Sequence, residues 1–191
     1  MATIDVRRRR IDAKIVYYGP GLSGKTTNLL DIHRRMPPDR RGPLRSLATD
    51  EERTLFFDFV PVAPILVGGW DLRIHLYSVP GQEHFARTRR AILGGADGVV
   101  FVADAAPDRQ EANRASFDEL GTFLDAYGRS PDDTALVLQL NKMDLPDAAP
   151  ESELLAALGG DGLPAFPAIA TRGNGVAETL QAISRQVARR L

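Results

Sequence analysis

Residues 15–26 read Ile15-Val16-Tyr17-Tyr18-Gly19-Pro20-Gly21-Leu22-Ser23-Gly24-Lys25-Thr26. The first four are β-branched or aromatic and the run stops at a glycine, which predicts a buried strand. The other eight match the pattern G-x-x-x-x-G-K-[ST], and a helical pattern then runs from Lys25 to Met36, where two prolines follow. A strand, a glycine-rich loop and a helix in this order are typical of a phosphate-binding loop.

The residue types of this loop suit polyphosphate binding. Glycines let the backbone curl so that successive N–H groups point at an anion, and the helix adds its positive dipole end. Lys25 is expected to reach the β- and γ-phosphates, and the Thr26 hydroxyl to bind Mg²⁺. The residues expected to contact the nucleotide here are Gly19, Gly21, Leu22, Ser23, Gly24, Lys25, Thr26 and Thr27. The alternative is a glycine-rich turn that caps an ordinary helix.

Strand and helix patterns alternate along the rest of the chain. Further strands are expected over residues 55–62, 72–79, 98–103, 135–140 and 165–170, and further helices over 111–127, 151–158 and 176–191. Residues 37–50 are polar and are expected to form a long loop. Together they predict an α/β fold with a mainly parallel six-stranded sheet and helices on both faces. We also expect one antiparallel edge hairpin near Gly68-Gly69 and an extra N-terminal strand over residues 3–6.

Composition narrows the function classes. The 191 residues are expected to form a single domain, 1–191, and the formal net charge of −1 argues against binding nucleic acid. The chain has no cysteine, which excludes disulfides, thiolate metal sites, prenylation and palmitoylation, so no lipid anchor is expected. The sequence contains no uncharged apolar stretch of about 20 residues, and we expect a cytoplasmic protein.

A second motif follows the strand that ends at Leu140. It reads Asn141-Lys142-Met143-Asp144. The Asp144 carboxylate can accept hydrogen bonds from guanine N1–H and the exocyclic amino group, whereas adenine has an acceptor at N1 and would be repelled. The Lys142 stem can lie against the base, and Asn141 can tie this loop to the phosphate loop. A solvated turn after a strand is the alternative.

With these motifs in register, the sequence resembles the Ras-like small GTPases and, most closely, the bacterial MglA family of gliding-motility and cell-polarity GTPases. The resemblance extends from about Ile11 to the C-terminus. Besides the phosphate loop, it is carried by residues 52–59, by Val79-Pro80-Gly81-Gln82 and by residues 141–148. It implies the fold of a Ras-like P-loop NTPase. Ala170-Thr171 resembles the last base-binding loop, where a backbone N–H meets guanine O6.

The resemblance also assigns roles around the γ-phosphate. It implies that Thr54 reaches Mg²⁺ and the γ-phosphate, that the Gly81 N–H contacts the γ-phosphate, and that Gln82 orients the attacking water. Arg53 matches an arginine thought to act as a finger in cis in MglA-like proteins. The catalytic residues expected are thus Arg53, Gln82 and Lys25. A surface arginine in an acidic run is the alternative for Arg53.

One position departs from ordinary Ras-like proteins. Their metal-site Asp, three residues before the switch glycine, is Ser78 here, as MglA-like proteins also lack it. Asp58 is our candidate replacement because a carboxylate is unusual in a strand as apolar as residues 55–59. The metal ligands expected are therefore Thr26, Thr54 and Asp58. An edge-strand carboxylate facing water is the alternative for Asp58.

The function implied is a GTP/GDP switch that hydrolyses GTP with Mg²⁺. By resemblance, a roadblock-fold dimer of the MglB type activates it, the GTP form recruits effector proteins, and the output is cell polarity or gliding motility, with recruitment to a cell pole. One rival is a metabolic kinase, which would not need Asn141 or Asp144. The other is a module that binds GTP with little or no hydrolysis.

The N-terminus carries a basic run, Arg7-Arg8-Arg9-Arg10. It could contact anionic lipid or an acidic partner. The plainer interpretation is a solvated hairpin turn that joins the N-terminal strand to the first long one.

Overall fold

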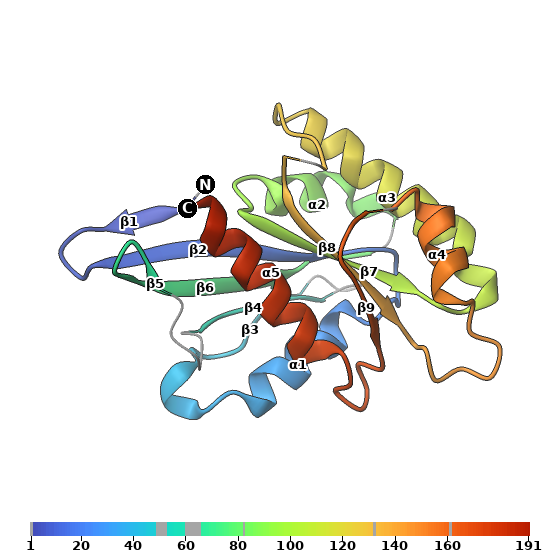
Figure 1. Ribbon diagram of the computed structural model, residues 1–191, viewed down its shortest axis with the longest axis horizontal. Helices are drawn as coiled ribbons and strands as arrows, with labels where there is room; N and C mark the ends of the chain where they lie inside the picture. The colour runs from blue at the N-terminus through green and yellow to red at the C-terminus, as the bar shows by residue number, and fades with distance from the viewer. Residues whose placement is uncertain (1, 49–52, 60–65, 82, 132, 161) are drawn as a thin grey trace.

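The computed structural model describes residues 2–48, 53–59, 66–81, 83–131, 133–160 and 162–191. Within these residues one nine-stranded sheet forms, with the order β3-β4-β6-β2-β7-β8-β9; β1 pairs with β2, and β5 pairs with β6 (Figure 1). The strands are β1 Thr3–Asp5, β2 Arg10–Tyr18, β3 Arg45–Ala48, β4 Arg53–Phe59, β5 Leu66–Val67, β6 Trp70–Ser78, β7 Gly98–Asp104, β8 Ala135–Asn141 and β9 Ala165–Ala168. The five strands from β6 to β9 in this order are parallel, and β4 is antiparallel to β6.

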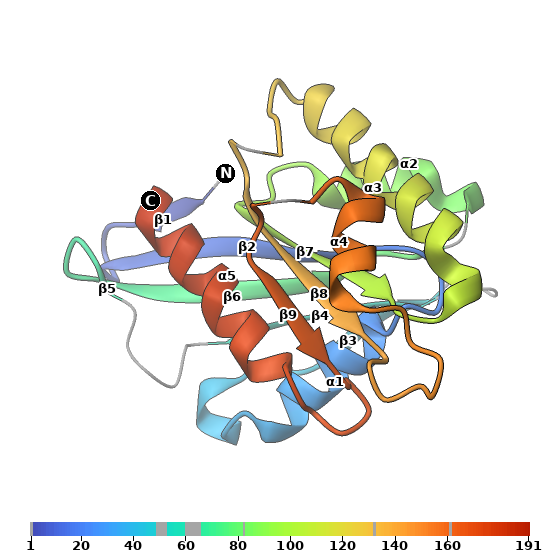
Figure 2. The ribbon, with the colours of Figure 1, turned by 45° about the vertical axis from the view of Figure 1, so that its right-hand side comes forward.

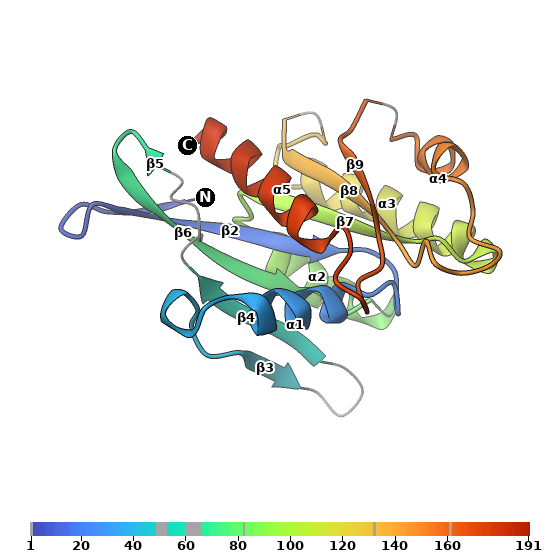
Figure 3. The same ribbon diagram turned by 60° about the horizontal axis from the view of Figure 1, so that its bottom comes forward.

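Helices cover both faces of the sheet. The helices are α1 Lys25–Arg35, α2 Ala86–Leu93, α3 Gln110–Asp125, α4 Glu151–Leu158 and α5 Val176–Arg190, with short 3₁₀ turns at Pro38–Arg40, Glu83–Phe85 and Pro107–Arg109. Figures 2 and 3 show α1 and α5 on one face, with α2, α3 and α4 on the other. Each face has its own buried apolar cluster. This is the three-layer arrangement that β-α-β crossovers produce.

Strand β2 shows why the core divides in two. Its alternate residues Ile15 and Tyr17 belong to the cluster beneath α1 and α5, whereas Val16 and Tyr18 belong to the cluster beneath α2 and α3. All four side chains are fully buried because β2 lies in the middle of the sheet. A strand buried on both faces reads as a continuous apolar run, which is the pattern that identified it in the sequence.

The six strands and the long helices expected from the sequence are present. The segment over residues 37–50 is a partial exception, because Arg45–Ala48 forms β3 where a loop was expected. Antiparallel pairing with β4 makes this strand, and its four residues carry too weak a pattern to predict it. The expected hairpin of β4 and β6 exists, but β3 and not β4 is the edge strand. Residues 60–62 of that predicted strand lie outside the described residues.

The parallel strands end at one edge of the sheet. Tyr17 of β2 is level with Ser78 of β6, and Asn141 of β8 is level with both Asp104 of β7 and Ala168 of β9. The loops that follow these strands are therefore neighbours, although they come from distant parts of the chain. Ligands of open α/β sheets bind at this edge.

Candidate functional site

The phosphate loop connects β2 to α1 and is held in a conformation that requires glycine at two positions. Gly19 has φ 138°, and a Cβ there would lie 2.3 Å from the Val102 carbonyl oxygen. Gly24 has φ 102°, and a Cβ there would lie 2.2 Å from Asn141 Nδ2. Leu22, which is not a glycine, also adopts a positive φ of 63°. Backbone strain of this kind is concentrated at functional sites.

The polar side chains of the loop are directed inward. Lys25 is only 5% exposed, and its Nζ donates hydrogen bonds to the carbonyl oxygens of Gly19 (2.8 Å) and Pro20 (2.6 Å). Within the described residues, the fully buried Ser23 Oγ has no hydrogen-bond partner. Thr26 and Thr27 are half-buried in the first turn of α1. A buried ammonium and an unpaired hydroxyl beside a helix N-terminus suit an anionic ligand.

Asn141 joins the two motifs. Its Nδ2 donates to the Ser23 carbonyl oxygen (2.8 Å), and its Oδ1 accepts the Ala170 N–H (2.9 Å). The contact between this loop and the phosphate loop is confirmed. A single amide side chain thus fixes the spacing of three loops that follow β2, β8 and β9.

A cavity of about 270 Å³ lies where these loops meet. It is lined by Leu22, Gly24, Thr27, Asn141, Lys142, Asp144, Leu145, Ile169, Ala170 and Thr171. Eight of these ten residues are sequence-predicted site residues; Leu145 and Ile169 are the two that the motifs missed. The structure therefore brings the phosphate-loop residues and the base-motif residues to one concave site.

In the last base-binding loop, backbone hydrogen bonds distinguish the two predicted residues, Ala170 and Thr171. The Ala170 N–H is already engaged by Asn141. The Thr171 N–H makes no hydrogen bond within the described part of the chain. Of the two predicted residues, Thr171 is therefore the one that offers a free backbone donor to a ligand in the cavity.

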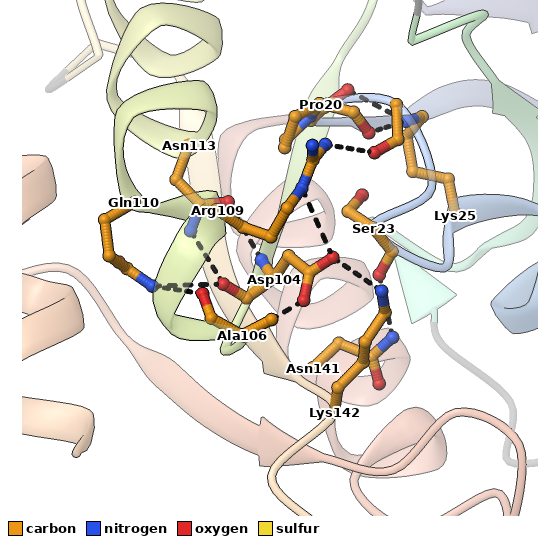
Figure 4. Close-up of polar contacts among 12 residues, drawn as sticks. Pro20, Ser23, Lys25, Asp104, Ala106, Arg109, Gln110, Asn113, Asn141 and Lys142 are labelled. Carbon is orange, nitrogen blue, oxygen red and sulfur yellow. Dashed lines mark hydrogen bonds and ion pairs between the residues drawn. The ribbon is translucent and has the colours of Figure 1, made fainter. Parts of the chain in front are cut away.

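Asp104 and Arg109 are site residues that the motifs did not reveal (Figure 4). Asp104 is fully buried at the end of β7, and its Oδ2 accepts a hydrogen bond from Lys142 Nζ at 2.6 Å and lies 3.8 Å from Arg109 Nε. Arg109 in turn donates from Nη2 to the Gly21 carbonyl oxygen at 2.8 Å. Lys142 has a positive φ of 68°. A charged residue directly after the predicted strand 98–103 was the available signal for Asp104.

Gly81 lies against the phosphate loop. A Cβ on Gly81 would be 2.5 Å from the N and Cα of Gly21 and 2.8 Å from Lys25 Nζ. The residue predicted to sense the γ-phosphate is thus next to the loop that would hold it. Gln82, the predicted water-orienting residue, lies outside the described residues.

The register of β4 places the backbone of three further predicted residues. Because β4 is antiparallel to β6, with Phe56 opposite Tyr77, β4 begins at the phosphate-loop edge, and Arg53 and Thr54 are its first residues. Asp58 is paired with His75, three residues or about 10 Å before the end of β6. The register is therefore more favourable for Thr54 than for Asp58 as a metal ligand.

A partly buried ion pair anchors α2 beside this edge. Arg89, 5% exposed, donates to both carboxylate oxygens of Glu119 on α3 (2.8 and 2.7 Å) and to the Pro80 carbonyl oxygen (3.3 Å). The Tyr18 hydroxyl donates to the same carboxylate. Burial alone would raise the pKa of Glu119, but the hydrogen bonds from Arg89 and Tyr18 outweigh it and hold the pKa below its usual value. Burial and the Glu119 charge raise the pKa of Tyr18.

The side chains provide few ligands for a metal. Across the described ranges, no group of three or more His, Asp or Glu residues could hold an ion. Thr26 offers a hydroxyl at the start of α1, next to the phosphate loop. This donor set fits Mg²⁺, which keeps several waters and takes further ligands from substrate phosphates.

Comparison with known proteins agrees with this geometry. Residues 65–187 match the family model described as Arf, the ADP-ribosylation factor family. The chain is 44% identical to the mutual gliding-motility protein MglA of Myxococcus xanthus, over 98% of this chain and 96% of that protein. It is 30% identical to ADP-ribosylation factor-like protein 6 of Caenorhabditis briggsae, over 78% of this chain and 70% of that protein. Elongation factor 4 of Levilactobacillus brevis is 31% identical over 62% of this chain, but over only 18% of its own length.

Fold, site and matches define a small GTPase of the Arf and Ras-like class, an enzyme that binds guanine nucleotide and hydrolyses GTP. Within this class, the chain belongs to the MglA family. Family membership excludes the metabolic kinase considered above. None of the helices in the described ranges is long and apolar enough to span a membrane.

Proposed function

We propose that this chain is a Mg²⁺-dependent GTP/GDP switch that controls cell polarity or gliding motility, with the base held by Asp144 and the phosphates by residues 19–27. The observation that supports this best is the 270 Å³ cavity lined by both motifs and braced by Asn141. The proposed process follows the name of the Myxococcus xanthus relative.

Base selection rests on groups around the cavity. The Asp144 carboxylate accepts two hydrogen bonds from guanine, and the Thr171 N–H donates to O6. Lys142, fixed by Asp104, places its methylene stem along one wall. The Arg172 guanidinium lies 3.5 Å from the Asp144 carboxylate at the rim of the cavity.

Residues around the phosphate loop, where the parallel strands end, carry out the proposed hydrolysis. Lys25 exchanges its bonds to loop carbonyls for bonds to the β- and γ-phosphates, and the loop N–H groups stabilise the charge that develops during in-line attack by water. Gln82 orients this water, and Arg53 completes the charge stabilisation. Thr26 and Thr54 would hold Mg²⁺, which would supply positive charge to neutralise the phosphates.

Switching uses the same contacts. The γ-phosphate orders the segments that contain Thr54 and Gly81, and its loss releases them. A roadblock-fold dimer of the MglB type activates hydrolysis by positioning Arg53, since the arginine is already in cis. The ordered form recruits effector proteins, and a cell pole is the proposed place of action.

The test of this proposal is a substitution that replaces one carboxylate oxygen of Asp144 with an amide NH2 group. Asp144→Asn should lose most of its affinity for GDP and gain affinity for xanthosine diphosphate, whose C2 carbonyl can accept the new amide N–H. Asp147→Asn is the matched control, because Asp147 is exposed in the same loop. Equal GDP affinity in the two variants, measured by fluorescence titration, would remove Asp144 from the site.

A further inference from the structure

The β1–β2 hairpin projects from the end of the sheet opposite the nucleotide site (Figure 1). The turn over residues 6–9 joins the two strands, and β2 then runs for nine residues before the phosphate loop begins at Gly19. At about 3.3 Å per residue, the tip of the hairpin lies roughly 30 Å from that loop. The hairpin takes no part in the site described above.

Two large apolar side chains of the hairpin are exposed. Val6 in the turn is 71% exposed and Ile4 in β1 is 60% exposed. Ile4 is paired with Ile11, which is buried in the cluster beneath α5, so Ile4 lies on that same face of the sheet but is left uncovered. Ile4 and Val6 are two positions apart, so the hairpin carries an exposed apolar portion that a partner surface could cover.

Three arginines follow directly. Arg7, Arg8 and Arg9 are exposed, and the positive φ of Arg9 (49°) helps to close the turn that presents them. Arg8 is partly neutralised by Asp5, with 3.7 Å between Arg8 Nε and the carboxylate. Within the described residues, Arg7 and Arg9 form no ion pair. We call Ile4, Val6, Arg7, Arg8 and Arg9 the hairpin patch.

The end of α5 lies near the start of β1, whereas the turn between β1 and β2 projects further out (Figures 1 and 2). The end of α5 carries the exposed Arg189, and Leu191 is 43% exposed. One end of the molecule thus combines exposed cations with exposed aliphatic side chains.

We propose that the hairpin patch binds the surface of an anionic lipid bilayer. Arg7 and Arg9 contact the headgroup phosphates, and Val6 and Ile4 enter the boundary between headgroups and acyl chains. A convex tip with an apolar apex beside guanidinium groups fits a flat, soft interface, whereas an acidic protein would have to offer a pocket for Val6. Because the tip is about 30 Å from the phosphate loop, this contact leaves the nucleotide site facing away from the membrane.

The proposed contact is weak and reversible because only a few arginines and two aliphatic side chains make it. Each arginine near an anionic surface strengthens binding about fivefold, and Val6 adds to this without dependence on salt. Removing Arg7 and Arg9 together should therefore weaken binding about 25-fold.

The experiment is co-sedimentation of the full chain with vesicles of phosphatidylcholine alone or mixed with phosphatidylglycerol. Binding should require phosphatidylglycerol and fall as salt is raised. The double variant Arg7→Ser, Arg9→Ser should lose about 25-fold in vesicle affinity. A matched control is Arg34→Ser, Arg114→Ser, which removes the same charge from exposed positions on α1 and α3 and should bind as the unmodified chain does. GDP affinity should be equal in all three proteins, which shows that they are folded.

A second variant reports on the apolar apex. In Val6→Trp the new indole should shift its emission to the blue on mixed vesicles, compared with the unmodified chain, which contains only Trp70. The proposal is wrong if the unmodified chain does not sediment with mixed vesicles at low salt, or if the hairpin and control variants bind equally. It is also wrong if Val6→Trp shows no shift while bound.

Discussion

At the scale of single residues, two strained positions flank the base cavity. Leu22 and Lys142 both have positive φ, a conformation that costs about 1–3 kcal/mol and persists only where neighbours enforce it. For Lys142 the enforcing group is Asp104, which is fully buried and 2.6 Å from its Nζ. Asp104 therefore acts as a positioning residue for the base loop.

Replacing this carboxylate tests the assignment. Asp104→Asn removes the charge that holds Lys142 and Arg109, so release of a fluorescent GDP analogue should be about tenfold faster, corresponding to about 1.4 kcal/mol. Asp108→Asn, the same chemical change at an exposed position nearby, should leave release unchanged. Identical release rates in both variants would mean that Asp104 does not position the loop.

Arg53 provides a second test at this scale. Because a finger in cis acts on the transition state, Arg53→Ala should leave GDP affinity unchanged. Single-turnover GTP hydrolysis by this variant, with activator present, should fall by about 10³-fold. Arg53→Lys should recover little, since an ammonium cannot meet two phosphate oxygens at once. A hydrolysis rate within a few-fold of the unmodified chain would assign Arg53 to the surface.

A substitution at Gly24 tests the packing between the phosphate loop and the loop that begins at Asn141. Alanine there would place Cβ 2.2 Å from Asn141 Nδ2, so Gly24→Ala should lose nucleotide affinity as well as stability. Gly128→Ala is the control: Gly128 also has a positive φ, but a Cβ there meets nothing within 4 Å. The control should lower the melting temperature and leave GDP affinity intact, and loss of affinity in both variants would argue against the contact.

At the scale of elements, α2 is held to the sheet through Arg89, Glu119 and Tyr18. Glu119 has a lowered pKa in the folded state, so its stabilising effect is present above the usual glutamate pKa of about 4.5 and is lost as the pH falls through the folded value. Glu119→Gln should therefore reduce the free energy of unfolding by about 2 kcal/mol at pH 7, and by less below pH 4.5.

Urea denaturation at both pH values measures this difference. Glu111→Gln, on an exposed position of the same helix, should change stability little at either pH. A Glu119→Gln effect that does not depend on pH would show that the pairing is not ionic.

The sequence made some elements and residues predictable and concealed others. Strands β7 and β8 are buried over their whole length and are mostly apolar, with Gln139 inside β8 and polar residues only at their ends otherwise. Prolines mark the end of α1. In contrast, α2 carries three arginines in eight residues and gives no clear core-facing pattern. Its Arg89 is buried only because Glu119, thirty residues away, meets it. Pairing between distant residues is what a local pattern cannot contain.

At the scale of the whole molecule, the sheet keeps two surfaces apart. The nucleotide loops occupy the edge where the parallel strands end, and the β1–β2 hairpin occupies the other end (Figure 1). Identity to the Myxococcus xanthus relative extends over both ends, whereas the elongation factor match covers 62% of the chain. We expect the chain, as a single domain, to unfold as one cooperative unit.

Ligand binding should therefore stabilise the entire chain. At a GDP concentration 100 times the Kd, the gain is about 2.7 kcal/mol, which corresponds to a rise in Tm of roughly 5–10 °C. ADP should give no rise, and a chelator should reduce the effect of GDP if Mg²⁺ contributes to binding. Thermal scans of the nucleotide-free chain measure all three.

The central claim is that the two motifs form one site for a guanine nucleotide. The most direct measurement is chromatography of the nucleotide released when the purified chain is denatured, followed by titration of the emptied chain with GDP and ADP. The account predicts release of GDP or GTP and rebinding of GDP but not ADP. Release of an adenine nucleotide, or equal binding of GDP and ADP, would contradict it.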